Sequence, residues 1–179
     1  MKRATIALAA IGCWLALALP AIAADLNIKA FFGKFTGSGI AQSEDSIYFA
    51  TTVRDTDVEM APTPDGFRAT WTTVLRQGGD PSKPNVRRRS TTMDFVQQPQ
   101  LNQFKAKPGE GIPPGGQAWA RINGNTLTVY IFSVDENGMY EIQTYARTLT
   151  GAGMDLTFSR IKDGEETRTV KAKLSRMAN

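Results

Sequence analysis

Histidine is absent from the 179-residue sequence, and cysteine occurs once, at position 13. The absence of histidine excludes Ser-His-Asp and Cys-His catalysis, and it excludes histidine-ligated zinc, copper and haem. A single cysteine cannot form an intrachain disulfide, so the stability of the fold must come from its core. We therefore expect no cofactor and no structural zinc site.

The acidic residues form no recognisable metal or catalytic motif. Asp55, Asp57 and Glu59 alternate along an expected strand, whereas a calcium loop places its ligands within about 12 residues around a central glycine. The pairs Asp55/Asp57 and Glu165/Glu166 have the residue types for acid–base catalysis, but a strand face and a turn explain them. We predict no metal site and no catalytic residues, which favours a binding protein over an enzyme.

Strong net charge is also missing. Removal of an N-terminal leader would take Lys2 and Arg3 from the 21 basic residues, which leaves a formal charge near +2 against 17 acidic residues. The run Arg87-Arg88-Arg89 has the charge to bind phosphate, lipid or nucleic acid, but only alternate residues of a strand share a face. We interpret this run as a solvated segment or a charged strand edge, and we do not expect nucleic acid as a partner.

Residues 1–24 have the pattern of a cleaved signal peptide. Lys2 and Arg3 precede an apolar stretch, and Ala21-Ile22-Ala23 supplies the small residues that a signal peptidase recognises. The alternatives are a retained membrane anchor, for which the apolar stretch is short, and a lipoprotein acylated at Cys13. We therefore predict export to the periplasm or the medium, with no transmembrane segment after cleavage.

Residues 25–179 read as a single antiparallel β domain. Runs of β-branched and aromatic residues alternate with polar ones between glycine- and proline-containing turns. About eight to ten strands follow one another, which predicts an all-β up-and-down barrel, with a β-sandwich as the alternative. Residues 25–32 are expected to be a short helix or a lead-in that plugs one end, and residues 97–116 a crossover or a lid. Further strands are expected at 33–41, 47–60, 67–75 and 86–96.

Two Asn-Gly pairs, at 123–124 and 137–138, predict β-hairpins, because both central residues of a type I′ turn need positive φ. Two-residue turns there place Ala120 opposite Leu127 and Ile131 opposite Thr144. Odd-numbered loops at Gly151 and at Asp163-Gly164 extend the same apolar face over five strands. We predict that this face is the core and comprises Ala118, Ala120, Ile122, Leu127, Val129, Ile131, Ile142, Ala146, Met154, Leu156, Phe158, Val170, Ala172 and Leu174.

The opposite face of the first three of these strands is aromatic and basic. In the predicted register Tyr130 lies across from Tyr145, and Arg147 lies on the same side as Tyr145. Aromatic rings beside arginines suit a carboxylate-bearing apolar ligand or a protein partner. The alternative is that a loop or a second sheet covers this face. The predicted ligand- or partner-binding residues are Trp119, Arg121, Tyr130, Phe132, Tyr145 and Arg147.

Arg160 follows Met154, Leu156 and Phe158 in the core-facing column. An inward arginine at this place could hold a carboxylate. The expected three-residue loop, however, places it opposite Glu166, and a surface ion pair is a sufficient explanation.

The pattern Phe32-Gly33-Lys34-Phe35, followed by sequential antiparallel strands and a basic last strand, resembles the calycin barrels, the lipocalins and their bacterial relatives. Lipocalins carry Gly-x-Trp at the first strand, and here phenylalanine replaces the tryptophan. The resemblance implies a lipophilic ligand in the barrel mouth. It also implies that Lys173 or Arg176 of the last strand packs over Phe35. The alternative is another family of exported bacterial proteins with a similar barrel.

Two functions are therefore expected for the domain. The first is a non-catalytic carrier that holds a small lipophilic or carboxylate-bearing ligand. The second is a homodimer or an envelope interaction module that uses the aromatic sheet face.

Overall fold

A computed structural model describes residues 24–43, 52–76, 86–109 and 111–178. The expected leader and Cys13 lie outside these residues, apart from residue 24, as does the start of the strand expected at 47–60. The short 3-10 helix η1 (Ile28–Phe31) is the only helix in the described part of the chain. No helix there is long and apolar enough to cross a membrane. The strands are β1 (Gly33–Ser43), β2 (Thr52–Thr63), β3 (Gly66–Arg76), β4 (Val86–Gln97), β5 (Gln103–Ala106), β6 (Gln117–Asn123), β7 (Thr126–Val134), β8 (Tyr140–Leu149), β9 (Gly153–Lys162) and β10 (Glu165–Arg176).

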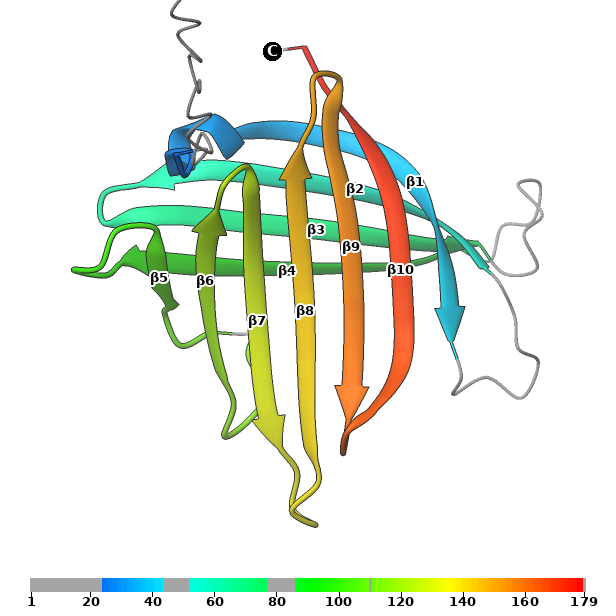
Figure 1. Ribbon diagram of the computed structural model, residues 1–179. Helices are drawn as coiled ribbons and strands as arrows, with labels where there is room; N and C mark the ends of the chain where they lie inside the picture. The colour runs from blue at the N-terminus through cyan, green and yellow to red at the C-terminus, as the bar shows by residue number, and fades with distance from the viewer. Residues whose placement is uncertain (1–23, 44–51, 77–85, 110, 179) are drawn as a thin grey trace, which may run out of the picture.

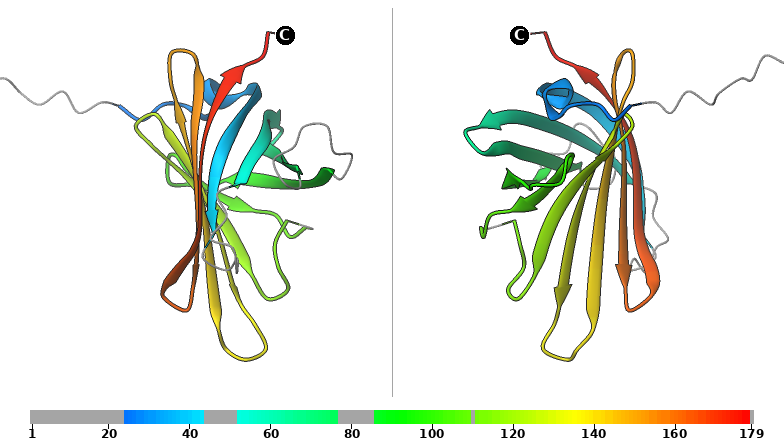
Figure 2. Two further views of the ribbon diagram at one scale, coloured as in Figure 1. Left: turned by 90° about the vertical axis from the view of Figure 1, so that its right-hand side faces the viewer. Right: turned by 60° about the vertical axis from the view of Figure 1, so that its left-hand side comes forward.

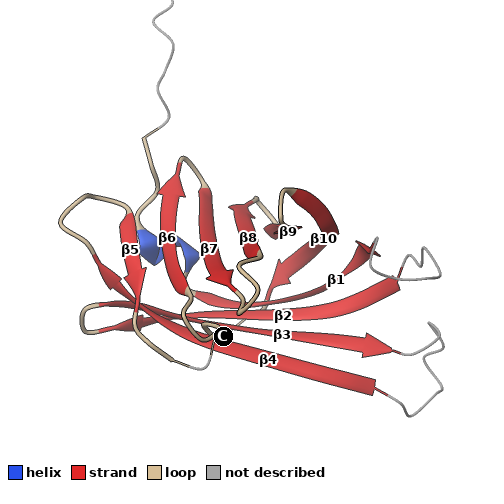
Figure 3. Cartoon of the chain, turned by 90° about the horizontal axis from the view of Figure 1, so that it is seen from below, coloured by secondary structure: helices blue, strands red, loops and turns tan. Residues whose placement is uncertain are grey.

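The ten strands form one closed antiparallel up-and-down barrel, which confirms the predicted fold class. Each strand pairs with its neighbours in sequence, and β1 closes the barrel by pairing with both β2 and β10. β2, β3 and β4 run across the view of Figure 1, whereas β6 to β10 run up and down it. Figures 2 and 3 show the same crossing of the two groups from other sides. The strand β5, which is missing from the prediction for residues 97–116, joins the two groups.

The glycines of β1 permit a close approach between β1 and β10. A side chain added at Gly37 would collide with the carbonyl oxygen of Lys173, and one at Gly39 would place its Cβ 2.5 Å from that of Ala172. Glycine at these two strand positions is therefore explained by the close approach of the neighbouring strand.

The register of the β6–β7 hairpin differs from the prediction by one residue in the turn. The loop residues are Gly124 and Asn125, because Asn123 pairs with Thr126, and Ala120 accordingly pairs with Val129 instead of Leu127. Both versions have two loop residues, so every side chain keeps its predicted face. The core positions predicted in β6 and β7 are buried: Ala118, Ala120, Ile122, Leu127, Val129 and Ile131.

The β7–β8 connection is where the predicted faces are wrong. Val134 pairs with Tyr140, so the loop has five residues, 135–139, instead of two. The Asp135 carboxylate stabilises it by accepting hydrogen bonds from the backbone N–H groups of Asn137, at 2.8 Å, and Met139, at 3.0 Å. A change from an even to an odd loop turns every side chain of β8 to the other face. Two members of the predicted core, Ile142 and Ala146, are therefore outside the barrel.

The last two connections restore the predicted faces. Leu149 pairs with Met154, and the β9–β10 turn at Asp163-Gly164 is followed by an irregularity between Glu166 and Arg168. Arg160 consequently lies opposite Arg168, and its predicted pairing with Glu166 is wrong. The core positions predicted in β9 and β10 are all buried: Met154, Leu156, Phe158, Val170, Ala172 and Leu174.

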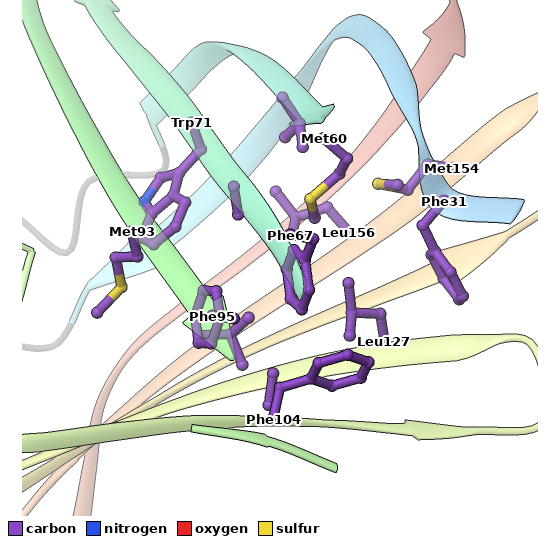
Figure 4. Packing of buried hydrophobic residues seen from close by; sticks show 14 of the residues in the cluster. Phe31, Met60, Phe67, Trp71, Met93, Phe95, Phe104, Leu127, Met154 and Leu156 are labelled. Atoms are coloured by element: carbon purple, nitrogen blue, oxygen red, sulfur yellow. The ribbon is translucent and has the colours of Figure 1, made fainter. Parts of the chain in front are cut away.

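Apolar side chains fill the end of the barrel that η1 covers. Phe67 stacks on Phe95 with ring centroids 4.7 Å apart and meets the edge of Phe104 at 4.9 Å (Figure 4). Phe31 of η1 is fully buried in the same cluster, which confirms the predicted plug.

Arg176 at the end of β10 holds η1 against the barrel. Its guanidinium lies 4.5 Å from the ring centroid of Phe35 and donates hydrogen bonds to the carbonyl oxygens of Phe32, at 2.6 Å, and Ala30, at 3.0 Å. This is one of the two contacts over Phe35 that the lipocalin resemblance implied.

Candidate functional site

The other end of the barrel interior holds a cavity of about 530 Å³. Six of the described residues that line it are arginines. No aspartate or glutamate is among the described lining residues. Aromatic, aliphatic and threonine side chains make up most of the rest. The lining residues used below are Arg54, Trp71, Tyr145, Arg147, Phe158 and Arg160.

Arg147 is the deepest charged group of this cavity. Its side chain is fully buried, and its guanidinium carbon lies 5.0 Å from the ring centroid of Trp71 and 5.4 Å from that of Tyr145. None of its three guanidinium nitrogens has a hydrogen-bond partner in the described part of the chain. Burial lowers the pKa of Arg147 to about 10, so the group still carries its charge at neutral pH.

The inward residues of β8 form a hydrogen-bonded row that leads to Arg147. The Tyr145 hydroxyl donates to Oε1 of Gln143 at 2.8 Å, and Nε2 of Gln143 donates to Oε1 of Glu141 at 2.6 Å. Burial raises the pKa of Tyr145, so its hydroxyl keeps the proton that it donates. The row therefore holds the Tyr145 ring in place beside the guanidinium of Arg147.

A second group of arginines lies nearer the open end. Burial, followed by the charges of Arg168 and Arg160, lowers the pKa of Arg54. Nε of Arg54 is buried and has no hydrogen-bond partner among the described residues. Nε of Arg160 lies 3.5 Å from Oε1 of Glu141, which is an ion-pair distance without a hydrogen bond. The positive charges of Arg54, Arg160 and Arg168 thus lie close to one another.

Two members of the basic run also belong to this end of the barrel. Arg87 and Arg89 line the cavity from the start of β4, whereas Arg88 between them does not. The alternation expected for a strand is confirmed. All three arginines are exposed, and this part of β4 does not pair with β5, which agrees with the interpretation as a solvated, charged strand edge. Two of the three side chains also add positive charge to the cavity.

The structure divides the predicted binding residues between the two sides of the barrel wall. Tyr145 and Arg147 point inward, and Trp119, Arg121 and Tyr130 belong to the outer surface. Tyr130 pairs with Thr144 instead of Tyr145. The single predicted cluster is therefore wrong, and its cause is the odd number of residues in the β7–β8 loop.

Trp119 and Tyr130 still form a contact on the outer surface. Their rings stack with centroids 5.3 Å apart, and Trp119 is 42% exposed. The ring centroid of Phe132 on β7 lies 6.5 Å from that of Tyr140 on the neighbouring strand β8. The aromatic face of the prediction thus exists, but without Tyr145 and Arg147.

Sequence reasoning did not identify Arg54 or Trp71 as site residues. Trp71 is recognisable as an inward residue of β3, but its contact with β8 depends on barrel closure. Arg54 shares the inward column of β2 with Val58 and Met60. The sequence does contain a signal for this site. Several strands each place an arginine at the end of a mainly apolar column of inward-facing residues.

No family model and no curated protein sequence matches this chain. An S-type phycobiliprotein lyase from Guillardia theta is 9% identical, with a TM-score of 0.38 over 85% of this chain and 91% of that chain. Secretory abundant heat soluble protein 4 from Ramazzottius varieornatus is 12% identical, with a TM-score of 0.37 over 83% of this chain and 95% of that chain. Similarity at this level carries no functional argument.

Proposed function

We propose that this protein is a non-catalytic binding protein that holds a small ligand with an anionic group inside the barrel. The observation that carries the proposal is Arg147, a fully buried guanidinium at the cavity with no hydrogen-bond partner in the described part of the chain. A buried charge without a partner is costly, and a carboxylate could accept two parallel hydrogen bonds from it. The ligand anion would therefore complete an otherwise unsatisfied group.

The walls around Arg147 suit an apolar or aromatic body for this ligand. Trp71, Tyr145 and Phe158 form a chain of ring contacts with centroids 5.0 Å and 4.7 Å apart. The cavity volume of about 530 Å³ lies within the range of roughly 300–1,000 Å³ that is common for small-molecule sites. The ligand class that fits is a small lipophilic acid.

Export and a lipocalin-like ancestry belong to the same proposal. The signal-peptide pattern of residues 1–24 supports delivery to the periplasm or the medium. The closed up-and-down barrel and the contact of Arg176 with Phe35 support the kinship with calycins. We infer a carrier or storage role for a lipophilic acid outside the cytoplasm.

Laurate binding tests the function directly. In a Trp119→Phe background, Trp71 is the remaining tryptophan of residues 25–179 and reports on the cavity by fluorescence. We expect laurate to bind and its methyl ester to bind much more weakly. Arg147→Met should weaken laurate binding by about 10- to 100-fold, the value of one charged hydrogen-bonding group. Arg147→Lys should recover only part of this loss, since an ammonium cannot replace the planar fork.

Arg121→Met is the matched control, because Arg121 lies on the outer surface and should leave the affinity unchanged. Native mass spectrometry of the protein purified from its own host provides an independent test. An absence of any co-purifying small molecule, together with no binding of laurate or of the dye anilinonaphthalenesulfonate, would refute the proposal.

A homodimer through the outer face is the second candidate. The stacked pair Trp119 and Tyr130, together with half-buried Phe132, favours it. Sedimentation of the wild type should show a dimer that Tyr130→Ser plus Phe132→Ser disrupts. A wild type that remains monomeric at high concentration would exclude this candidate.

A further inference from the structure

The arginines of the cavity lie at two depths. β8 relates the two positions: Arg147 belongs to the deep group, and Gln143 pairs with Arg160 of the outer group. Gln143 is four positions from Arg147, so the Cα atoms of these two residues lie roughly 13 Å apart along the strand. The charges of Arg168 and Arg160 contribute to the lowered pKa of Arg54, whereas burial lowers the pKa of Arg147. The deep and the outer arginines therefore form two separate positively charged groups.

The space between the two depths is aromatic. Tyr145 lies midway between Arg147 and Gln143 in the inward row of β8. Its strand partners are Val129 and Phe158, and its ring centroid is 5.4 Å from the guanidinium carbon of Arg147. Its ring is 4.7 Å from that of Phe158 and 5.0 Å from that of Trp71. A ligand that spans the two depths would therefore place an apolar or aromatic segment in this zone.

The outer arginines have the unsatisfied charge of a second anion site. Arg54 and Arg160 each have a buried Nε without a hydrogen-bond partner among the described residues. Glu141 offsets part of the charge of Arg160, but it also accepts a hydrogen bond from Gln143 and lies 3.8 Å from Nζ of Lys162. Two arginines held close together repel each other, and an anion between them would relieve this repulsion.

We propose that the ligand is an amphipathic dianion, with an anionic group at each end of an apolar or aromatic segment. One end binds Arg147, and the other binds Arg54 and Arg160. This inference rests on the proposed function, because it adds a second contact to the same ligand. It distinguishes the protein from a general carrier of monoanionic fatty acids.

Paired ligands of equal chain length test the inference. Dodecanedioate and laurate share the same number of carbons and differ by one carboxylate. We expect the full-length processed protein to bind dodecanedioate about 10- to 100-fold more tightly than laurate, the value of one additional charged contact. In a series of dicarboxylates, affinity should peak near this length, and hexanedioate should be too short to reach both groups.

The double variant Arg54→Gln plus Arg160→Gln should reduce the advantage of dodecanedioate over laurate, measured as the ratio of the two affinities in the same protein, to less than about two-fold. Arg147→Met should weaken both ligands. Because the double variant relieves repulsion between like charges, we expect it to fold, and circular dichroism with thermal unfolding checks this. The conservative pair Arg54→Lys plus Arg160→Lys keeps the charge and should retain part of the advantage.

The possible failures are distinguishable. If laurate binds as tightly as dodecanedioate, the dianion inference is wrong and the proposed function remains. If the advantage of dodecanedioate survives in the double variant, the assignment of the outer site to Arg54 and Arg160 is wrong. If neither ligand binds, the proposed function and this inference fail together.

Discussion

The two ends of the barrel interior differ in what fills them. At the end covered by η1, fully buried phenylalanines pack against one another. At the other end, arginines and aromatic rings surround a cavity. A single strand can contribute to both ends. β3 contributes Phe67 to the first end and Trp71 to the second.

This difference separates stability from function within one barrel. Burial of apolar side chains is the main source of stability, whereas a buried guanidinium without a partner reduces it. A protein under selection for stability alone would fill the second end as it fills the first. The presence of arginines there fits a binding role, because functional sites often reduce stability.

The largest expected effect is at the filled end. Phe67→Ala should lower the free energy of unfolding by about 3–5 kcal/mol, because it removes a fully buried ring and leaves a void. Urea unfolding monitored by circular dichroism measures this loss. Thr73→Ala on the same strand lines the cavity and is the control, with an expected change below about 1 kcal/mol. Equal losses at the two positions would contradict the division of the interior.

Replacement of Arg147 should raise the free energy of unfolding, whereas Phe67→Ala lowers it. Arg147→Met substitutes an apolar side chain for an unpaired buried charge and should stabilise the ligand-free protein by about 1–4 kcal/mol. The same variant loses ligand affinity, so stability and binding change in opposite directions. A clear destabilisation in the absence of ligand would show that Arg147 is a structural residue.

The stability gain from Arg147→Met should depend on pH. Burial lowers the folded-state pKa of Arg147 to about 10, well below the usual range of an arginine. Below pH 10 both states bind the proton, and the wild type carries the full cost of the buried charge. Above pH 10 the folded state releases the proton while the unfolded state keeps it, so wild-type stability rises relative to the variant. The difference in unfolding free energy between the wild type and Arg147→Met should therefore be smaller at about pH 11 than at about pH 8. A constant difference would contradict the lowered pKa.

A smaller effect is expected where Arg176 holds η1. Arg176→Ala removes two hydrogen bonds and the contact with Phe35, and should cost about 1–2 kcal/mol. Faster hydrogen exchange at the Phe32 amide, which donates to the Lys29 carbonyl, should accompany this loss. Lys171→Ala, at an exposed position of the same strand, is the matched control. Unchanged exchange would show that η1 is held without Arg176.

The smallest effect is expected on the outer surface. Trp119→Ala removes its stacking with Tyr130 and should cost about 0.5–1 kcal/mol, the usual value of a cross-strand pair. Its laurate affinity, measured by calorimetry, should equal that of the wild type because Trp119 does not line the cavity. A loss of affinity would connect the outer face to the ligand site.

Part of the candidate site was predictable from the sequence. Tyr145 and Arg147 were predicted as binding residues because they lie two apart on a strand, a relation that no register error can change. Their assignment to the same face as Trp119 failed, because it depended on the length of one loop. The Asn137-Gly138 pair marked a turn correctly, but the hydrogen bonds of Asp135 enclose five residues.

The sequence by itself determined the fold class, a short helix or plug within residues 25–32 and most of the core, because alternation within a strand is local information. Only the tertiary structure decided which face of β8 is inside, and that Arg54, Trp71 and Arg147 meet in one cavity. These contacts join strands that are distant in sequence, and they depend on barrel closure and on the parity of each loop. One residue in a turn thus decides whether an arginine faces the outer surface or the interior of the barrel.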